Sequence, residues 1–197
     1  MKKSAFTMLE LIIVIVVGGI LAAVMIPRLE RDPTREAANQ LVRHMQYAQH
    51  LAMVNDVYDD QNPTWFQQRW QIWFNNPKGY VVRSVRANTV IATDPATQME
   101  INSAVDNSAG DLRDFDLTSV TLTGGCAAAI STGDGPAIGF DNFGKPHFFT
   151  NAADFTGATA TDHAMGSQCT ITLVGDSKTA TITIEPETGY VRLVGVI

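Results

Sequence analysis

The hydrophobic pattern of the chain begins with one long apolar stretch. Residues 6–26 contain a single charge, that of Glu10. As a helix, these 21 residues would span about 31 Å, close to the thickness of the hydrocarbon core of a bilayer. Lys2 and Lys3 precede the stretch, and basic residues on that side favour a cytoplasmic N-terminus with an external body. The pattern therefore predicts a transmembrane helix over residues 6–27.

Two simpler interpretations of this stretch remain open: a cleaved secretory signal peptide and a plain signal anchor. The apolar run is long for a signal peptide, and no small-x-small cleavage site follows it before Pro27. Neither interpretation accounts for Glu10, because a lone carboxylate in an apolar helix costs a few kcal/mol in a bilayer. Glu10 is therefore expected to have a functional partner.

The second pattern has the period of an amphipathic helix and occupies residues 28–55. Asp32 and Pro33 have the character of a helix start, with Asp as the N-cap and Pro at the first helical position. Apolar residues then recur at spacings of three and four, which defines one face of a helix that ends near Asn55. We expect this face to pack against a sheet; it consists of Ala37, Ala38, Leu41, Val42, Met45, Ala48, Leu51 and Ala52.

From residue 69 onward the period shifts to two, which predicts strands. Trp70, Ile72 and Phe74 share one face, and a turn at residues 75–79 leads into a second strand at 80–85, so this pair forms a hairpin. Further strands are predicted near residues 117–122, 137–140, 169–174, 180–185 and 190–193. Loops are predicted at residues 56–68, 86–115 and 151–167. The expected fold class is α+β, with a β-rich globular domain at residues 56–197.

The N-terminus carries a more specific combination of residues. A short basic leader, residues 1–5, ends in the small residue Ala5 and is followed by Phe6, Thr7, Met8, Leu9, Glu10 and a long apolar run. This combination resembles the leader of type IV pilins and type II secretion pseudopilins. Pro27 falls where many pilins have a helix-kinking proline. Ala5 departs from the glycine that the family usually has at the cut.

The resemblance implies a fold, a location and a set of partners. The fold would be pilin-like, with a long N-terminal helix, half membrane-embedded and half amphipathic, packed on an antiparallel β-rich domain. A prepilin peptidase would cut between Ala5 and Phe6 and methylate the new amine of Phe6. The chain would cross the bacterial inner membrane once, in contact with lipid and an assembly platform, and then join a periplasmic or extracellular filament with other pilins. In the filament, Glu10 would attract the amine of Phe6 on a neighbouring subunit.

The later segments narrow the resemblance. A Trp-containing strand, the segment 138–146 with its Asp and Gly turn, and a final hairpin resemble the H-type minor pseudopilins and minor pilins, the GspH/FimT group. The implied function is that of a structural subunit, and not of an enzyme. The alternative is a FimT-like pilus-tip module that binds DNA or another extracellular ligand. The formal net charge of −6 argues against nucleic acid, which is bound through Lys and Arg.

The two cysteines, Cys126 and Cys169, are predicted to form a disulfide if the body lies outside the cytoplasm. The alternative is two buried free thiols. No spacing of cysteine and histidine indicates zinc.

The other candidate site residues are interpreted as structural, so no cofactor and no metal is expected. His44 and His50 are six residues apart and are expected on the helix surface, while His147 and His163 are scattered. Two groups of carboxylates could ligate calcium, but solvated loops are the simpler interpretation. The first group is Asp59 and Asp60, and the second is Asp111, Asp114 and Asp116. Three tryptophans beside two phenylalanines suggest core packing, with a sugar or partner surface as the alternative; they are Trp65, Trp70 and Trp73 beside Phe66 and Phe74.

Overall fold

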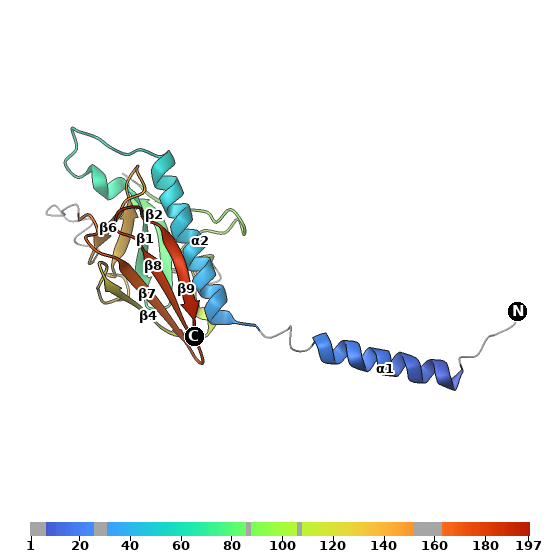
Figure 1. Cartoon of the computed structure of the whole chain (residues 1–197). Coiled ribbons are helices and arrows are strands. Elements are labelled where there is room, and N and C mark those ends of the chain that lie inside the picture. Colours follow the sequence, from blue (N-terminus) through green and yellow to red (C-terminus); the bar gives the residue numbers. More distant parts are fainter. Residues whose placement is uncertain (1–6, 26–30, 86–87, 106–107, 152–162) are drawn as a thin grey trace, which may run out of the picture. The chain divides into compact units, whose positions relative to one another are not determined.

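The structure, a computed structural model, divides into two compact units after Asp32. The first comprises residues 1–32 and the second residues 33–197, and each is described by itself. The residues that the structure describes are 7–25, 31–85, 88–105, 108–151 and 163–197 (Figure 1).

The first unit contains a single described helix, α1 (Met8–Met25). Its large apolar side chains from Met8 to Leu21 are between 49% and 84% exposed. Among the described residues, no helix combines the length and the apolar character needed to cross a membrane.

The second unit consists of helix α2 (Pro33–Val54) and two antiparallel sheets. The fold class is therefore α+β, as predicted. The five-stranded sheet has the order β3 (Thr89–Ile91), β2 (Gly79–Val85), β1 (Trp70–Asn76), β5 (Ala137–Phe140) and β6 (Pro146–Phe149). The four-stranded sheet has the order β4 (Leu117–Gly124), β7 (Cys169–Gly175), β8 (Thr179–Ile184) and β9 (Val191–Val196). Two short 3₁₀ helices are η2 (Trp65–Gln68) and η3 (Arg113–Phe115).

Helix α2 provides one side of the main core. It packs on β1 and β5 of the first sheet and on β7, β8 and β9 of the second, and Figure 1 shows it running beside β9. The apolar face predicted from the sequence is confirmed, because six of its eight residues are buried in this core and Val42 and Leu51 pack at its edge. The six are Ala37, Ala38, Leu41, Met45, Ala48 and Ala52.

The first sheet is covered on both faces. Trp70, Ile72 and Phe74 point into the main core, as the alternation in β1 predicted. Trp73 points to the opposite face, where a second cluster forms around Phe66 of η2. Residues 56–68, predicted as a loop, thus contain a short helix that covers this face of the sheet.

Two strands were missed by the sequence analysis. β3 lies in the predicted loop 86–115, and β6 directly follows the turn after β5. Both are edge strands of the sheet, and they have only three and four residues. β6 begins with Pro146, and proline is tolerated as the first residue of an edge strand. Such short segments carry no clear alternation.

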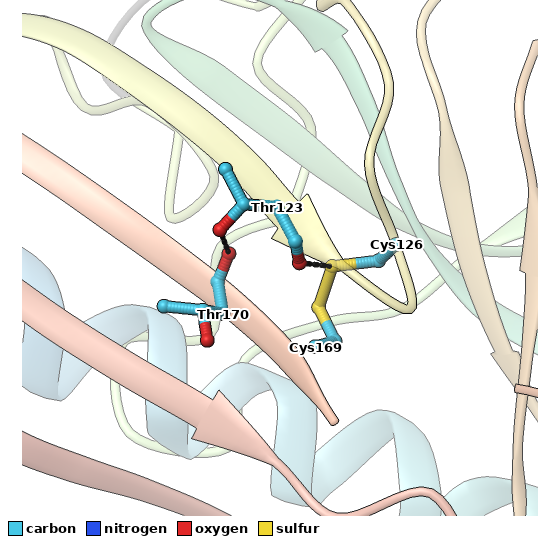
Figure 2. Close-up of a disulfide and its surroundings, with 4 residues drawn as sticks. All are labelled: Thr123, Cys126, Cys169 and Thr170. Carbon is cyan, nitrogen blue, oxygen red and sulfur yellow. Dashed lines mark hydrogen bonds between the residues drawn. A yellow bond between two sulfur atoms is a disulfide. The ribbon is translucent and has the colours of Figure 1, made fainter. Parts of the chain in front are cut away.

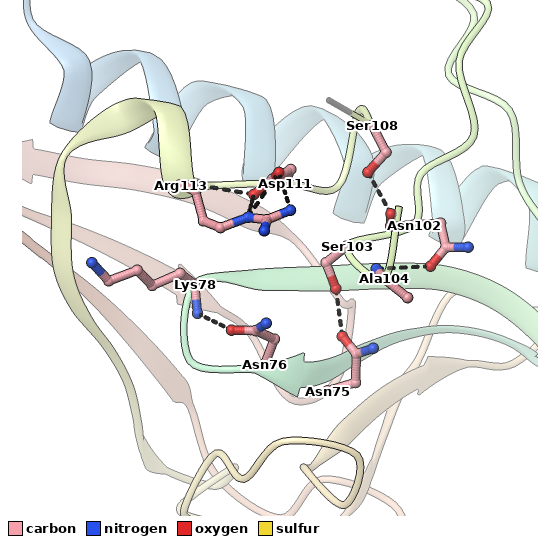
Figure 3. A network of polar contacts seen from close by, with 9 residues as sticks. All are labelled: Asn75, Asn76, Lys78, Asn102, Ser103, Ala104, Ser108, Asp111 and Arg113. Atoms are coloured by element: carbon pink, nitrogen blue, oxygen red, sulfur yellow. Dashed lines mark hydrogen bonds and ion pairs between the residues drawn. The ribbon is translucent and has the colours of Figure 1, made fainter. Parts of the chain in front are cut away.

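The segment after β3 belongs to the predicted loop 86–115 and consists mainly of turns and isolated bridges. It folds back on β2, where the N–H of Val82 donates to the carbonyl of Ile101 at 3.0 Å. Ile101 and Leu112 are completely buried. Figure 3 shows the polar contacts that fix this segment on the β1–β2 turn, among them the Ser103 hydroxyl and the Asn75 side-chain oxygen, 2.6 Å apart. A side chain at Gly110 would collide with the Tyr80 carbonyl, so the close approach requires glycine there.

The helix start predicted at Asp32 and Pro33 is confirmed. Of residues 28–55, Arg31 and Asp32 are not helical, and α2 begins at Pro33. Proline is suited to the first helical position because its missing N–H would have no partner there. Residues 28–30 and the predicted kink at Pro27 lie outside the described residues.

The predicted disulfide between Cys126 and Cys169 is confirmed (Figure 2). It joins Cys126, in the turn after β4, to Cys169, the first residue of β7. Cys169 is also paired in register with Gly124, the last residue of β4. Both cysteines are completely buried. The bridge closes a loop with a sequence separation of 43 residues that includes β5 and β6 of the other sheet.

A buried polar cluster links α2 to the first sheet and to the segment after β3. His44 Nδ1 lies 2.7 Å from the Tyr80 hydroxyl, and its Nε2 lies 3.7 Å from the carboxylate of Asp94. Burial lowers the pKa of His44 to about 4, although Asp94 acts in the opposite direction. Burial also raises the pKa of Tyr80. For Asp94, burial acts to raise the pKa, but hydrogen bonds from Ala96 and Thr97 offset it and hold the pKa below its usual value.

Removal of the disulfide should lower the free energy of unfolding by about 3–4 kcal/mol, because the unfolded chain then gains the entropy of the opened loop. The measurement is urea unfolding of the full-length protein in detergent, with and without a reductant. The matched control is the double variant Cys126→Ala/Cys169→Ala, whose stability should not respond to the reductant. An equal response of both proteins would contradict the prediction.

The stability of the second unit should fall as the pH drops from 6.5 towards 4. His44 has its ordinary pKa of 6.5 in the unfolded chain and about 4 in the fold, so the fold favours the neutral imidazole. The stabilisation is complete above pH 6.5 and is lost below it, by about 2–3 kcal/mol between pH 7.5 and 4.5. Urea unfolding of His44→Gln across this range should show a correspondingly smaller change. His50→Gln is the matched control, since it removes an exposed imidazole from the same helix.

Candidate functional site

The candidate site is the start of α1, where the sequence places Phe6 and Glu10. The described chain begins at Thr7, which directly precedes the first helical residue, Met8. The helix N-terminus exposes N–H groups that have no partner within the helix and carry a partial positive charge. A carboxylate in the first turn, here that of Glu10, is therefore favourable.

Thr7 and Glu10 form a reciprocal pair at this helix start. The N–H of Glu10 donates to the Thr7 hydroxyl oxygen at 3.3 Å, and the N–H of Thr7 donates to Glu10 Oε2 at 3.5 Å. This is the capping box, in which Thr at the N-cap and Glu three residues later each satisfy one free N–H group. Both side chains are exposed.

The capping box is a function of Glu10 that the sequence analysis missed, although the signal was present. The order Thr-x-x-Glu before an apolar run is the usual pattern of a capping box. The carboxylate of Glu10 therefore has an intrachain partner before any neighbouring subunit is present. This long contact orients the carboxylate towards the start of the helix.

The other residues predicted for this site are not part of the described structure. Ala5 and Phe6, on either side of the predicted cut, and Pro27 lie outside the described residues. Phe6 and Glu10 are the two residues predicted to act in subunit assembly, and of these the structure describes only Glu10.

One of the two histidines predicted on the helix surface is buried instead. His44 was expected on the helix surface, but it is only 3% exposed and faces Tyr80 across the core. His147 is buried as well, and its Nε2 lies 3.4 Å from the carboxylate of Asp141. His50 is exposed on α2, as expected. Among the described residues, no group of three or more His, Cys, Asp or Glu could hold a metal ion.

The candidate calcium ligands do not converge in the structure. Asp111 is buried and bound by the guanidinium of Arg113, with Nη2 2.7 Å from Oδ2 (Figure 3). Asp59 accepts from the N–H of Gln61 at 3.0 Å, which closes a local turn. The remaining candidates are exposed; they are Asp60, Asp114 and Asp116.

The tryptophans are divided between two clusters. Trp70 belongs to the main core, whereas Trp65 and Trp73 lie partly buried against the second cluster around Phe66. Trp73 also carries the guanidinium of Arg83 at 3.7 Å from its ring centroid. Burial lowers the pKa of Arg83 to about 10, so this arginine remains charged at neutral pH. The prediction of core packing is thus correct for Trp70 and Phe74 and correct in part for the other two tryptophans.

Comparison with known proteins gives one result. Residues 1–26 match the family model of the prokaryotic N-terminal methylation motif. No curated protein and no solved structure matches the chain.

The match agrees with the resemblance based on residues 1–10. The motif implies processing by a prepilin peptidase and assembly with other pilins. It suggests a membrane-anchored and later extracellular protein, and a structural subunit rather than an enzyme. The α+β body is consistent with a pilin-like fold. At residues 1–26 the chain therefore carries the N-terminal methylation motif, which is the prepilin leader of type IV pilins and pseudopilins.

Proposed function

We propose that the chain is a structural subunit, a minor pseudopilin or minor pilin, of a type II secretion pseudopilus or a type IV pilus. The observation that carries the proposal is the methylation motif at residues 1–26, which includes the exposed apolar helix α1. A helix that is apolar on all sides requires surroundings other than water. The inner membrane provides them before assembly, and the packed helices of a filament provide them afterwards.

Processing starts at the leader. A prepilin peptidase removes residues 1–5 and exposes the amine of Phe6, which is then methylated. The small side chain of Ala5 is the closest substitute for glycine at the cut. The mature chain is anchored by its apolar run, with its body in the periplasm, until an inner-membrane assembly platform extracts it into the filament.

Assembly uses the charge of Glu10. In an apolar filament core, an isolated carboxylate and an isolated ammonium each cost several kcal/mol, and the cost is much smaller when they pair. Glu10 of one subunit therefore accepts the methylated amine of Phe6 on its neighbour. This pairing acts mainly to set the register of one helix against the next.

The body supports the assignment to the H-type minor group. A Trp-containing strand, β1, follows α2, and the turn between β5 and β6 contains Asp141 and Gly144. The chain ends in the antiparallel pair β8 and β9. This order of elements is the one that the resemblance predicted.

Processing is tested by the mass of the mature protein. The protein isolated from membranes should lack residues 1–5 and carry one additional methyl group on Phe6. Ala5→Leu should abolish cleavage, because a large residue does not fit where the peptidase takes a small one, whereas Ala5→Gly should be cleaved at least as well as the natural sequence. Retention of the leader in the natural protein would contradict the proposal.

The role of Glu10 is tested by Glu10→Gln. Glutamine at this position preserves the capping box but removes the charge, so α1 keeps its N-terminal cap while the amine of Phe6 loses its partner. A buried charge without its partner costs about 3 kcal/mol or more, so incorporation into filaments should fall roughly 100-fold. The measurement is the amount of the variant in sheared filaments relative to membranes.

Two further variants complete this test. Glu10→Ala removes both the cap and the charge and should assemble no better than Glu10→Gln. Thr7→Ala weakens the cap but keeps the charge, and should assemble far better than either. Normal incorporation of Glu10→Gln would contradict a role of the charge in assembly.

A further inference from the structure

The surface of the second unit presents an exposed aromatic side chain on a rigid turn. Phe143 is 84% exposed, the highest value for an aromatic residue among the large exposed hydrophobics of the described chain. It lies in the turn between β5 and β6, residues 141–145, which we call the knob. A single exposed apolar side chain needs no partner, so Phe143 becomes informative only together with a complementary surface on the same chain.

The knob is fixed by its own hydrogen bonds. The carboxylate of Asp141 accepts from the N–H groups of Phe143 and Lys145 at 2.9 and 2.8 Å. Gly144 has a positive φ of 83°, and its carbonyl accepts from the amide of Gln49 on α2 at 2.9 Å. The turn therefore holds Phe143 outward at little further cost in conformational entropy.

The same unit contains a pocket large enough for an aromatic ring. The pocket, with a volume of about 220 Å³, lies between α2 and the turn at residues 94–96. A cavity of about 150 Å³ accepts benzene in another protein. The lining is mostly apolar and consists of Arg43, His44, Tyr47, Asp94, Pro95 and Ala96.

The walls of the pocket are held in place independently of any guest. His44 is fixed between Tyr80 and Asp94, as described above. The carboxylate of Asp94 accepts from the N–H of Ala96 at 3.1 Å and from the hydroxyl of Thr97 at 2.8 Å. Arg43 adds a cation at the edge, which favours an aromatic guest through its ring face.

The knob and the pocket lie against different positions of α2. The knob contacts α2 near Gln49 and Met53, and the pocket is lined by Arg43 and Tyr47. Six residues separate these positions, which is about 9 Å along the helix and about a third of a turn around it. The contact joins two different patches, so one copy can engage a second through its knob, its pocket or both.

We propose that Phe143 of one copy inserts into this pocket of a second copy. The chain itself carries both complementary parts, a rigid aromatic residue and an apolar pocket of matching size. This goes beyond the proposed function, because it requires two copies of the chain to be neighbours and assigns the contact to their bodies. The contact buries too little surface to hold two copies together alone. It therefore orients one copy against the other, while other surfaces also stabilise the association.

The test is photocrosslinking of the full-length chain with benzoylphenylalanine in place of Phe143. Isotope-labelled and unlabelled protein are mixed in detergent, irradiated and analysed by mass spectrometry. Mixed-label crosslinks should join position 143 to peptides that contain residues 43–47 or 94–96. The matched control carries the same group in place of Tyr190, which is 58% exposed on another turn, and should not label these peptides.

A second variant tests the pocket itself. Ala96→Trp changes an exposed residue and fills the pocket, so it should reduce the crosslink yield from position 143 at least fivefold. Crosslinks that map elsewhere on the second copy, to detergent only or to no second copy at all would overturn the proposal, as would an unchanged yield in Ala96→Trp.

The same variants separate this inference from the proposed function. Leader cleavage and presence in sheared filaments are measured for Phe143→Ala and Ala96→Trp alongside the natural chain. If the natural chain enters filaments but position 143 does not label the pocket, only the contact between bodies is wrong. If the natural chain keeps its leader and is absent from filaments, the proposed function is wrong whatever the crosslink shows.

Discussion

The packing of the alanine-rich face of α2 against both sheets is the contact on which the rest of the body depends. The sheets have separate hydrogen-bond ladders, and α2 packs on strands of each. Short side chains such as those of Ala38, Ala48 and Ala52 let the helix backbone approach the strands closely. Larger residues at these positions would separate the helix from one sheet or the other, because a close-packed core has little room for extra atoms.

Polar residues of α2 give this packing its direction. The hydrophobic effect is not directional, so an apolar face alone permits small rotations and shifts of a helix. Three glutamines on α2 donate to main-chain carbonyls of distant segments: Gln40 to Ala109, Gln46 to Val191 and Gln49 to Gly144. His44 adds a fourth link through Tyr80. Since each partner comes from a different part of the chain, together they select one position of the helix.

Apart from the disulfide, the features predicted from the sequence depend on local periodicity, and most of those missed depend on distant partners. The buried face of α2 and the alternation of Trp70, Ile72 and Phe74 follow from the spacing of neighbouring residues, and both were correct. The short edge strands carry too few residues for a period. The burial of His44 could not be predicted, because it depends on Tyr80 and Asp94, which lie 36 and 50 positions further along the chain. At the candidate site, the motif was recognisable in residues 1–10, whereas the capping role of Glu10 was overlooked despite a local signal.

The disulfide has a mechanical consequence for a chain that is pulled from its N-terminal end. The bridge closes a ring that runs from the end of β4 through β5 and β6 to the start of β7. Tension along the backbone passes across the two sulfur atoms and leaves the ring unloaded. With a sequence separation of 43, roughly 150 Å of chain is withheld from extension. Two strands of the five-stranded sheet lie within the ring, so this part of the body would remain short even after the force had unfolded the rest.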